Sequence, residues 1–157
     1  MGLVHDFLLV PDNDDGEFNV VSFVGQFRDA VRLGSEDYVG IHGDLVDYFW
    51  DFIKWIPTYN PSKKEPGLGL NYYGVTVIKK DGAQLAYEVF SLLARLVALG
   101  PETITLRGNY VFNNNGTKGG YEEVEFNRDE TVRKLEKLAF FCRRILNSDY
   151  QLKHLGI

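Results

Sequence analysis

One short segment carries most of the side chains that could do chemistry. Asp44, Asp47 and Asp51 recur at i, i+3 and i+7 in G-D-L-V-D-Y-F-W-D-F-I-K-W-I-P, so a helix would place their carboxylates on one side. On the helical wheel Trp50 falls near Asp47 and Asp51, away from the side expected to face the core, which is formed by Leu45, Phe49, Phe52 and Ile56. Indole rings bury a large area at interfaces and carboxylates steer basic partners. We expect a basic protein partner to bind a patch made of Asp44, Asp47, Trp50 and Asp51.

A second interpretation of this segment is purely structural. The loop expected at residues 57–69, or the N-terminal strand, could cover the indole of Trp50. Asp44 would then cap the N-terminus of the following helix, with Gly43 permitting a sharp entry. The sequence leaves both interpretations open.

Histidine, serine and cysteine catalysis has little support in the sequence. His5, His42 and His154 are too far apart in the chain to indicate a site, so core or surface roles are expected for each. No G-x-S-x-G turn supports a serine nucleophile. Cys142 lies on the apolar face of a predicted helix, where a thiol behaves as a small hydrophobic group with a raised pKa. We expect no catalytic residue and no cofactor, which favours a binding protein over an enzyme.

A metal centre is also not expected. The motif G-D-L-V-D, residues 43–47, resembles the second metal-binding block of calcineurin-like metallophosphoesterases, where an aspartate bridges two metal ions. R-G-N-Y stands where that family has G-N-H, so Tyr110 replaces a histidine ligand. The early D-x-H block is missing, and the chain has 3 histidines, whereas a binuclear site needs about seven or eight ligands.

A different class of function, an enzyme or a small-ligand-binding protein, would need a pocket between sheet and helices. We would expect four polar side chains to line it: Tyr72, Tyr73, Arg107 and Tyr110. Alternation along a strand weakens this set, because neighbours such as Tyr72 and Tyr73 point to opposite faces.

The composition is that of a folded globular chain. It has 157 residues, 45% hydrophobic and 25% charged, so we expect one domain over residues 1–157 with a core of its own. The formal net charge is −5, but residues 1–60 carry 11 acidic and 3 basic side chains, whereas residues 61–157 carry 11 and 14. This acidic N-terminal part keeps the chain soluble, disfavours nucleic acid as a partner and favours basic proteins.

Three features predict a cytoplasmic location. No run reaches the roughly 20 apolar residues that span a bilayer, so we expect no membrane association. The N-terminus lacks the basic region and the cleavage site of a secretion signal. Cys142 is the only cysteine, which fits a reducing compartment.

Hydrophobic periodicity and turn residues predict the elements that position these side chains. Asn19 as N-cap and Gly34 as the stop bound the first helix. Residues 57–69 hold three of the five prolines and indicate a connecting loop, while the helix at 83–99 is apolar nearly all round, which is typical of deep burial. The expected elements are strands at 3–10, 70–78, 103–112 and 121–126, and helices at 20–33, 44–56, 83–99 and 129–146.

This order predicts an α+β fold, with a largely antiparallel sheet, a C-terminal β-hairpin and helices packed on the sheet. The strand at 70–78, the helix at 83–99 and the hairpin strand at 103–112 are expected to form its nucleus.

Residues 70–146 resemble bacterial toxin-immunity proteins. The resemblance lies in the strand L-N-Y-Y-G-V-T-V-I, the apolar helix after it, the hairpin and the closing charged helix. It implies a stoichiometric inhibitor whose acidic face occludes a basic toxin domain. A further alternative is a structural homo-oligomer in which Trp50 and Trp55 are self-association contacts.

Overall fold

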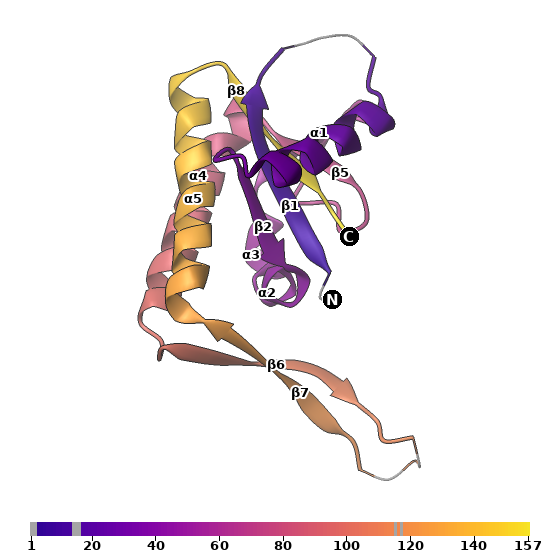
Figure 1. Ribbon diagram of the computed structural model, residues 1–157, viewed down its shortest axis with the longest axis vertical. Helices are drawn as coiled ribbons and strands as arrows, with labels where there is room; N and C mark the ends of the chain where they lie inside the picture. Colours follow the sequence, from indigo (N-terminus) through magenta and orange to yellow (C-terminus); the bar gives the residue numbers. More distant parts are fainter. Residues whose placement is uncertain (1–2, 14–16, 115, 117) are drawn as a thin grey trace.

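The computed structural model describes residues 3–13, 17–114, 116 and 118–157. Within this part of the chain, six strands form one sheet in which each pair of neighbours is antiparallel (Figure 1). The expected α+β class with a largely antiparallel sheet is confirmed. The strands, in sheet order, are β2 (Tyr38–His42), β1 (Val4–Pro11), β8 (Tyr150–Leu155), β5 (Val75–Ile78), β3 (Pro57–Asn60) and β4 (Glu65–Leu68).

Helices cover both faces of this sheet. α1 (Val20–Leu33) lies across one face, whereas α4 (Lys80–Ala98) and α5 (Arg128–Asn147) pack side by side on the other (Figure 1). The short helices α2 (Gly43–Tyr48) and α3 (Trp50–Ile53) follow β2 and share the core of α4 and α5. No helix in the described ranges is long and apolar enough to cross a membrane.

Burial along β1 divides the interior into two cores. Phe7 and Leu9 belong to the core beneath α4 and α5, whereas Leu8 packs with Phe23 and Phe27 of α1. Successive side chains of a strand point to opposite faces, so both sets are buried when both faces are covered. This explains the unbroken apolar run at residues 7–10.

The sequence predicted the ends of the helices better than it predicted which of their side chains are buried. Asn19 Oδ1 accepts a hydrogen bond from the backbone N–H of Ser22 at 3.0 Å, and Gly34 ends α1 with a left-handed φ of 61°. Both predicted caps are confirmed. The expected deep burial of α4 is wrong in part, because Leu92 and Leu96 are each 58% exposed. This helix packs on α5 and the sheet and leaves its remaining side uncovered.

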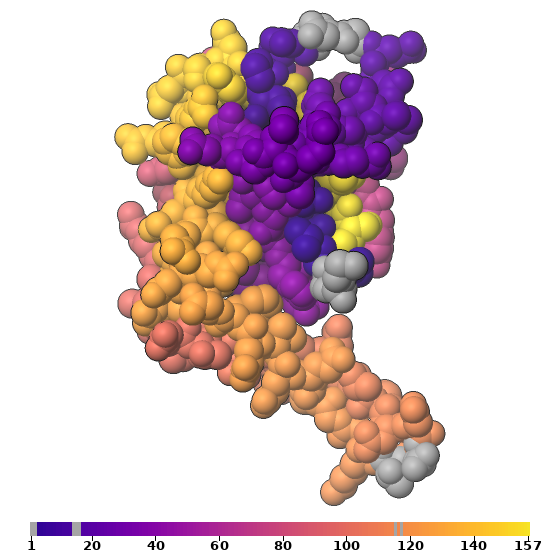
Figure 2. All heavy atoms as spheres, viewed as in Figure 1, coloured from indigo at the N-terminus to yellow at the C-terminus, as the bar shows by residue number. Residues whose placement is uncertain are grey.

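The predicted hairpin is confirmed, and only its base packs against the hydrophobic core. β6 (Thr103–Val111) and β7 (Gly120–Asn127) pair only with each other among the described strands, and they project from the body as an arm (Figures 1 and 2). Ile104, Leu106 and Phe126 at the base pack partly against the core. None of the described residues in the outer half of the hairpin packs against either core cluster.

The expected helix over residues 44–56 is interrupted. Phe49, with φ −99° and ψ 7°, ends α2 and precedes α3. The break changes the direction in which the following side chains point. Phe52, expected in the core, is 43% exposed, whereas Ile53 is buried and Trp50 packs partly against the core.

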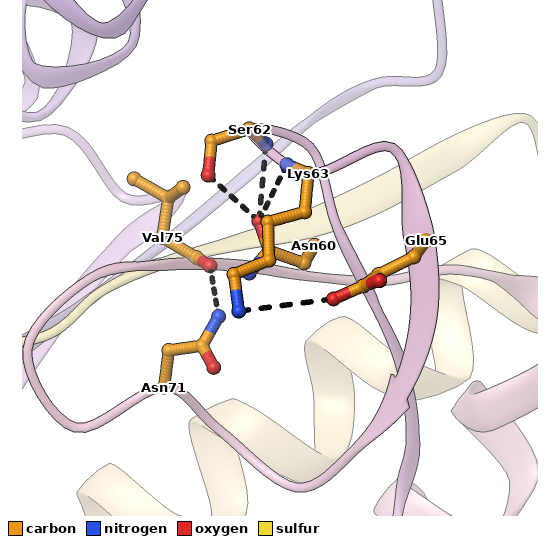
Figure 3. Close-up of polar contacts among 6 residues, drawn as sticks. All are labelled: Asn60, Ser62, Lys63, Glu65, Asn71 and Val75. Carbon is orange, nitrogen blue, oxygen red and sulfur yellow. Dashed lines mark hydrogen bonds and ion pairs between the residues drawn. The ribbon is translucent and has the colours of Figure 1, made fainter.

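The expectation of a connecting loop at residues 57–69 is wrong, because β3 and β4 form a β-hairpin there. Asn60 Oδ1 accepts hydrogen bonds from the backbone N–H groups of Ser62 and Lys63 at 3.1 and 3.2 Å, which closes the turn (Figure 3). Proline is tolerated here because Pro57 opens its strand and Pro66 lies on the edge strand β4.

Two further strands of the sheet, β2 and β8, were not predicted from the sequence either. β2 and β8 are short, and β8 alternates polar and apolar residues near the end of the chain. The expected strand at 70–78 shortens to β5, because residues 70–74 form a turn. Asn71 closes this turn by donating its side-chain N–H to the carbonyl of Val75 at 2.6 Å (Figure 3).

Candidate functional site

Two buried histidines meet in the middle of the sheet. His5 on β1 and His154 on β8 are both 0% exposed, and Nδ1 of His5 lies 2.9 Å from Nε2 of His154. The strand register explains the contact. His154 is opposite Phe7 on β1, and His5 precedes Phe7 by two residues, so both imidazoles point to the same face. Their rings are stacked with an interplanar angle of 11°.

At one end of the pair, His154 contacts Thr76 of β5, whereas at the other end a nitrogen of His5 has no hydrogen-bond partner among the described residues. Nδ1 of His154 lies 3.4 Å from Oγ1 of Thr76, which accepts the backbone N–H of Asn71 at 2.8 Å. Nε2 of His5 is buried without a hydrogen-bond partner among the described residues. One proton between the two rings can belong to either histidine, so Nε2 of His5 is either a free donor or a free acceptor.

Burial controls the charge of the pair. Desolvation lowers the pKa of His5, and the carboxylate of Asp47 opposes this shift in part. Desolvation lowers the pKa of His154 well below the ordinary value of 6.5, and His5 lowers it further. Both imidazoles are therefore neutral at neutral pH.

Aromatic side chains from α3 and from the turn before β5 pack near His5. The ring of Tyr72, in the turn before β5, lies 5.0 Å from the imidazole, and Trp50 of α3 lies 5.4 Å from Tyr72. The hydroxyl of Tyr72 donates a hydrogen bond to Oδ2 of Asp47 at 3.1 Å. Burial, with the acceptor Asp47, raises the pKa of Tyr72 to about 12. Asp47 and Trp50 of the expected patch thus meet Tyr72 of the alternative ligand set.

The three carboxylates of the expected patch are exposed, but its tryptophan, Trp50, is not. Asp44, Asp47 and Asp51 all lie on the surface. Trp50 is half-buried, because the break at Phe49 turns it toward the core. The indole that faces outward is that of Trp55, which is 58% exposed.

Three aromatic side chains accompany the carboxylates. Trp55 and Phe52 are in contact, with ring centroids 5.4 Å apart, and Tyr48 is 53% exposed. We name the exposed side chains of this segment the α2–α3 surface: Asp44, Asp47, Tyr48, Asp51, Phe52 and Trp55.

The alternative expectation that Asp44 caps the N-terminus of the helix is wrong. The residue before α2 is His42, whose Nδ1 accepts the backbone N–H of Asp44 at 3.3 Å. Asp44 lies in the first turn, where a carboxylate interacts favourably with the helix dipole.

The four residues of the alternative ligand set do not line one pocket. Tyr72 and Tyr73 belong to a turn, so strand alternation does not apply to them, and Tyr73 is 83% exposed. Arg107 and Tyr110 lie on the projecting hairpin (Figure 1). There the Arg107 guanidinium covers the ring of Tyr121 at 4.6 Å, and Tyr110 contacts the same ring at 5.1 Å.

A cavity of about 680 Å³ does lie between the sheet and a helix, at another place. It is bounded by α1, by the end of β1, by β8 and β5, and by the turn between β3 and β4. Its polar lining includes Gln151 and Lys153, which the sequence did not single out.

Other chemistry has less support. No three His, Cys, Asp or Glu side chains of the described segments gather so that they could hold a metal ion. Burial raises the pKa of the Cys142 thiol to about 12, as expected for an inert cysteine on an apolar helix face. No family model, no curated protein and no solved structure matches this chain.

Proposed function

We propose that this protein is a non-catalytic binding protein whose α2–α3 surface docks on a basic protein partner. The observation that carries the proposal is the exposed contact between Phe52 and Trp55, in the same segment as the exposed carboxylates of Asp47 and Asp51. Large aromatic side chains are the usual energetic anchors of interfaces. Exposed tryptophan in contact with a second exposed aromatic ring has no evident role in the packing of the chain itself.

The charge of this surface defines the partner. The segment carries three carboxylates and the amine of Lys54, which pairs with Asp51 at 3.3 Å. Carboxylates around an apolar centre attract a basic surface and accelerate encounter, with a strong dependence on salt. An immunity-type inhibitor, which the resemblance of residues 70–146 implies, would use this surface to occlude a basic toxin domain.

The test compares partners of the wild-type chain and of two variants. Proteins retained from a lysate are identified by mass spectrometry, and the basic ones are purified and titrated by calorimetry. We expect Asp51→Asn to weaken binding and reduce its salt dependence, and Trp55→Ala to weaken it by tenfold or more. The matched controls are Asp29→Asn on α1 and Phe140→Ala on α5, both exposed and outside this surface. A purified partner that binds all four variants equally contradicts the proposal.

Self-association is the competing use of the same surface. In a structural homo-oligomer, Trp50 and Trp55 are the expected contacts between copies, and of these two side chains Trp55 is the exposed one. Sedimentation equilibrium of the wild type and of Trp55→Ala distinguishes the two functions. A stable wild-type dimer that Trp55→Ala dissociates would replace the proposal of a basic partner with that of a homo-oligomer.

A further inference from the structure

We propose that the cavity between α1 and the sheet binds a small organic anion, a carboxylate or a phosphate monoester, with Lys153 as its counter-charge and Gln151 beneath it. The cavity lies on the face of the sheet opposite the α2–α3 surface. This inference is independent of the proposed function.

The cavity exists because α1 covers only part of its face of the sheet. Phe23 and Phe27 fill the space above β1, β8 and β5 together with Leu8, Val75 and Val77. The cavity lies beside the N-terminal turns of α1, where Ser22, Phe23 and Gln26 line it. A volume of about 680 Å³ is well within the range of roughly 300–1,000 Å³ typical of small-molecule sites.

Gln151 is the first sign that a ligand completes this cavity. It lies on β8 with its side chain on the cavity side of the sheet, and it is 9% exposed. Its amide makes no side-chain hydrogen bond with any residue of the described ranges. The amide lines the cavity, so its donor and acceptor groups can serve a ligand that carries hydrogen-bonding groups.

Lys153 is the second sign. It follows Gln151 by two residues on β8, so both side chains point to the same side. Its Nζ donates to Oε1 of Gln26 at 2.8 Å and lies 5.0 Å from the ring of Phe23, and it forms no ion pair with a described carboxylate. Burial lowers the pKa of this amine. A half-buried cation with neutral partners is a site where an anion gains more than it would at an exposed lysine.

The other charges of the lining favour a ligand with one anionic group. Lys79 is engaged with Asp12 at 3.8 Å, and Lys64 lines the cavity near the turn between β3 and β4. The N-terminus of α1 also borders the cavity, where its dipole adds positive potential. The carboxylate of Glu17 on the same rim would repel a highly charged ligand.

The walls indicate the rest of the ligand. The rings of Phe18, Phe23 and Tyr59 line the cavity together with Val10 and Val77. An apolar or aromatic body could pack against them while the anionic group reaches Lys153. The chemical class is therefore an organic anion with an apolar part, rather than an inorganic ion.

The experiment is a titration followed by ¹H–¹⁵N NMR. The probes are phenylacetate and adenosine 5′-monophosphate, each paired with a neutral counterpart, phenylacetamide and adenosine, and inorganic phosphate is added separately. We expect at least one organic anion to cause saturable shifts of the Gln151 side-chain amide and of the backbone amides of Ser22 and Lys153. Its neutral counterpart should bind at least tenfold more weakly.

Variants assign the effect to the cavity. Lys153→Gln should weaken the binding of that probe by tenfold or more, whereas Lys80→Gln, an exposed lysine outside the lining, should not change it. If Lys153→Gln does not fold, Lys64→Gln gives the same comparison with a smaller expected loss. The proposal is overturned if no organic anion causes saturable shifts, if the neutral counterparts bind equally, or if inorganic phosphate alone binds. Unchanged binding by Asp51→Asn would show that the result is separate from the α2–α3 surface.

Discussion

Nδ1 of His5 and Nε2 of His154 lie 2.9 Å apart in the interior, although the two residues are 149 positions apart in the chain. The contact exists because the first and last strands, β1 and β8, are neighbours in the interior of the sheet. Burial keeps both rings neutral, so protonation of either histidine should lower the stability of the native state.

Stability should fall in mildly acidic solution. The pKa values of His5 and His154 are lowered in the native state, whereas the same groups take up protons near pH 6.5 in the unfolded chain. Below pH 6.5 the unfolded state therefore binds more protons than the native state. The contribution of the two neutral histidines to the unfolding free energy is complete above pH 6.5, and it is lost as the pH falls toward their native-state pKa values. Each histidine contributes a slope of up to about 1.4 kcal/mol per pH unit, measurable by urea unfolding between about pH 7.5 and 5.5.

Histidine variants identify the groups responsible. His154→Gln removes one buried imidazole, so the loss of stability between the two pH values should become smaller, whatever the variant's absolute stability. His42→Gln changes a histidine outside the pair and should leave the loss in place. Equal pH dependence in wild type and His154→Gln would mean that other groups are responsible.

The carboxylate of Asp47 should influence two neighbouring pKa values in the same direction. It raises the pKa of Tyr72, which is about 12, and opposes the lowering of the pKa of His5. Asp47→Asn should therefore lower the pKa of both groups, because a nearby negative charge disfavours the phenolate and favours the imidazolium. NMR titration of ¹³C-labelled tyrosine and histidine measures both. Asp44→Asn is the control, since Asp44 is the weakest contributor to the pKa of Tyr72.

Two helical glycines should respond to alanine in opposite ways. A Cβ on Gly82, near the start of α4, would lie 1.9 Å from the carbonyl oxygen of Pro57 on β3, so Gly82→Ala should cost roughly 2 kcal/mol or more of unfolding free energy. A Cβ on Gly25 in α1 meets nothing within 4 Å, so Gly25→Ala should stabilise the chain by about 0.5–1 kcal/mol. Urea unfolding measures both changes. A neutral Gly82→Ala would show that α4 and β3 can separate without cost.

The outer half of the hairpin should contribute little to stability. Phe112 is 75% exposed, and its ring contact is with Tyr110 on the same arm. Phe112→Ser should therefore change the unfolding free energy by less than about 0.5 kcal/mol. Phe126→Ala at the base, where the ring packs partly on the core, should cost about 1–3 kcal/mol. Equal losses from the two variants would show that the arm contacts the body along its length.

The sequence predicted well those elements whose signals are local. α1 has its apolar spacing, its Asn19 cap and its Gly34 stop within 16 residues, and α4, α5 and the hairpin likewise contain their own periodicity and turns. The same signals misplaced Trp50 and Phe52, because one residue with non-helical backbone, Phe49, alters the orientation of every side chain after it. A helical wheel assumes an uninterrupted helix, so it cannot predict side-chain directions beyond such a break.

The composition and the periodicity of the sequence by themselves determined the α+β class, the acidic N-terminal part and the exposed carboxylates of α2 and α3. Only the tertiary structure decided that β2 and β8 join the sheet, that His5 meets His154, and that Gln151 and Lys153 line a cavity. The physical reason is that a short strand is stabilised by hydrogen bonds to neighbouring strands. Polar residues such as those of β8 become buried only because β1 and β5, distant in the chain, flank them in space.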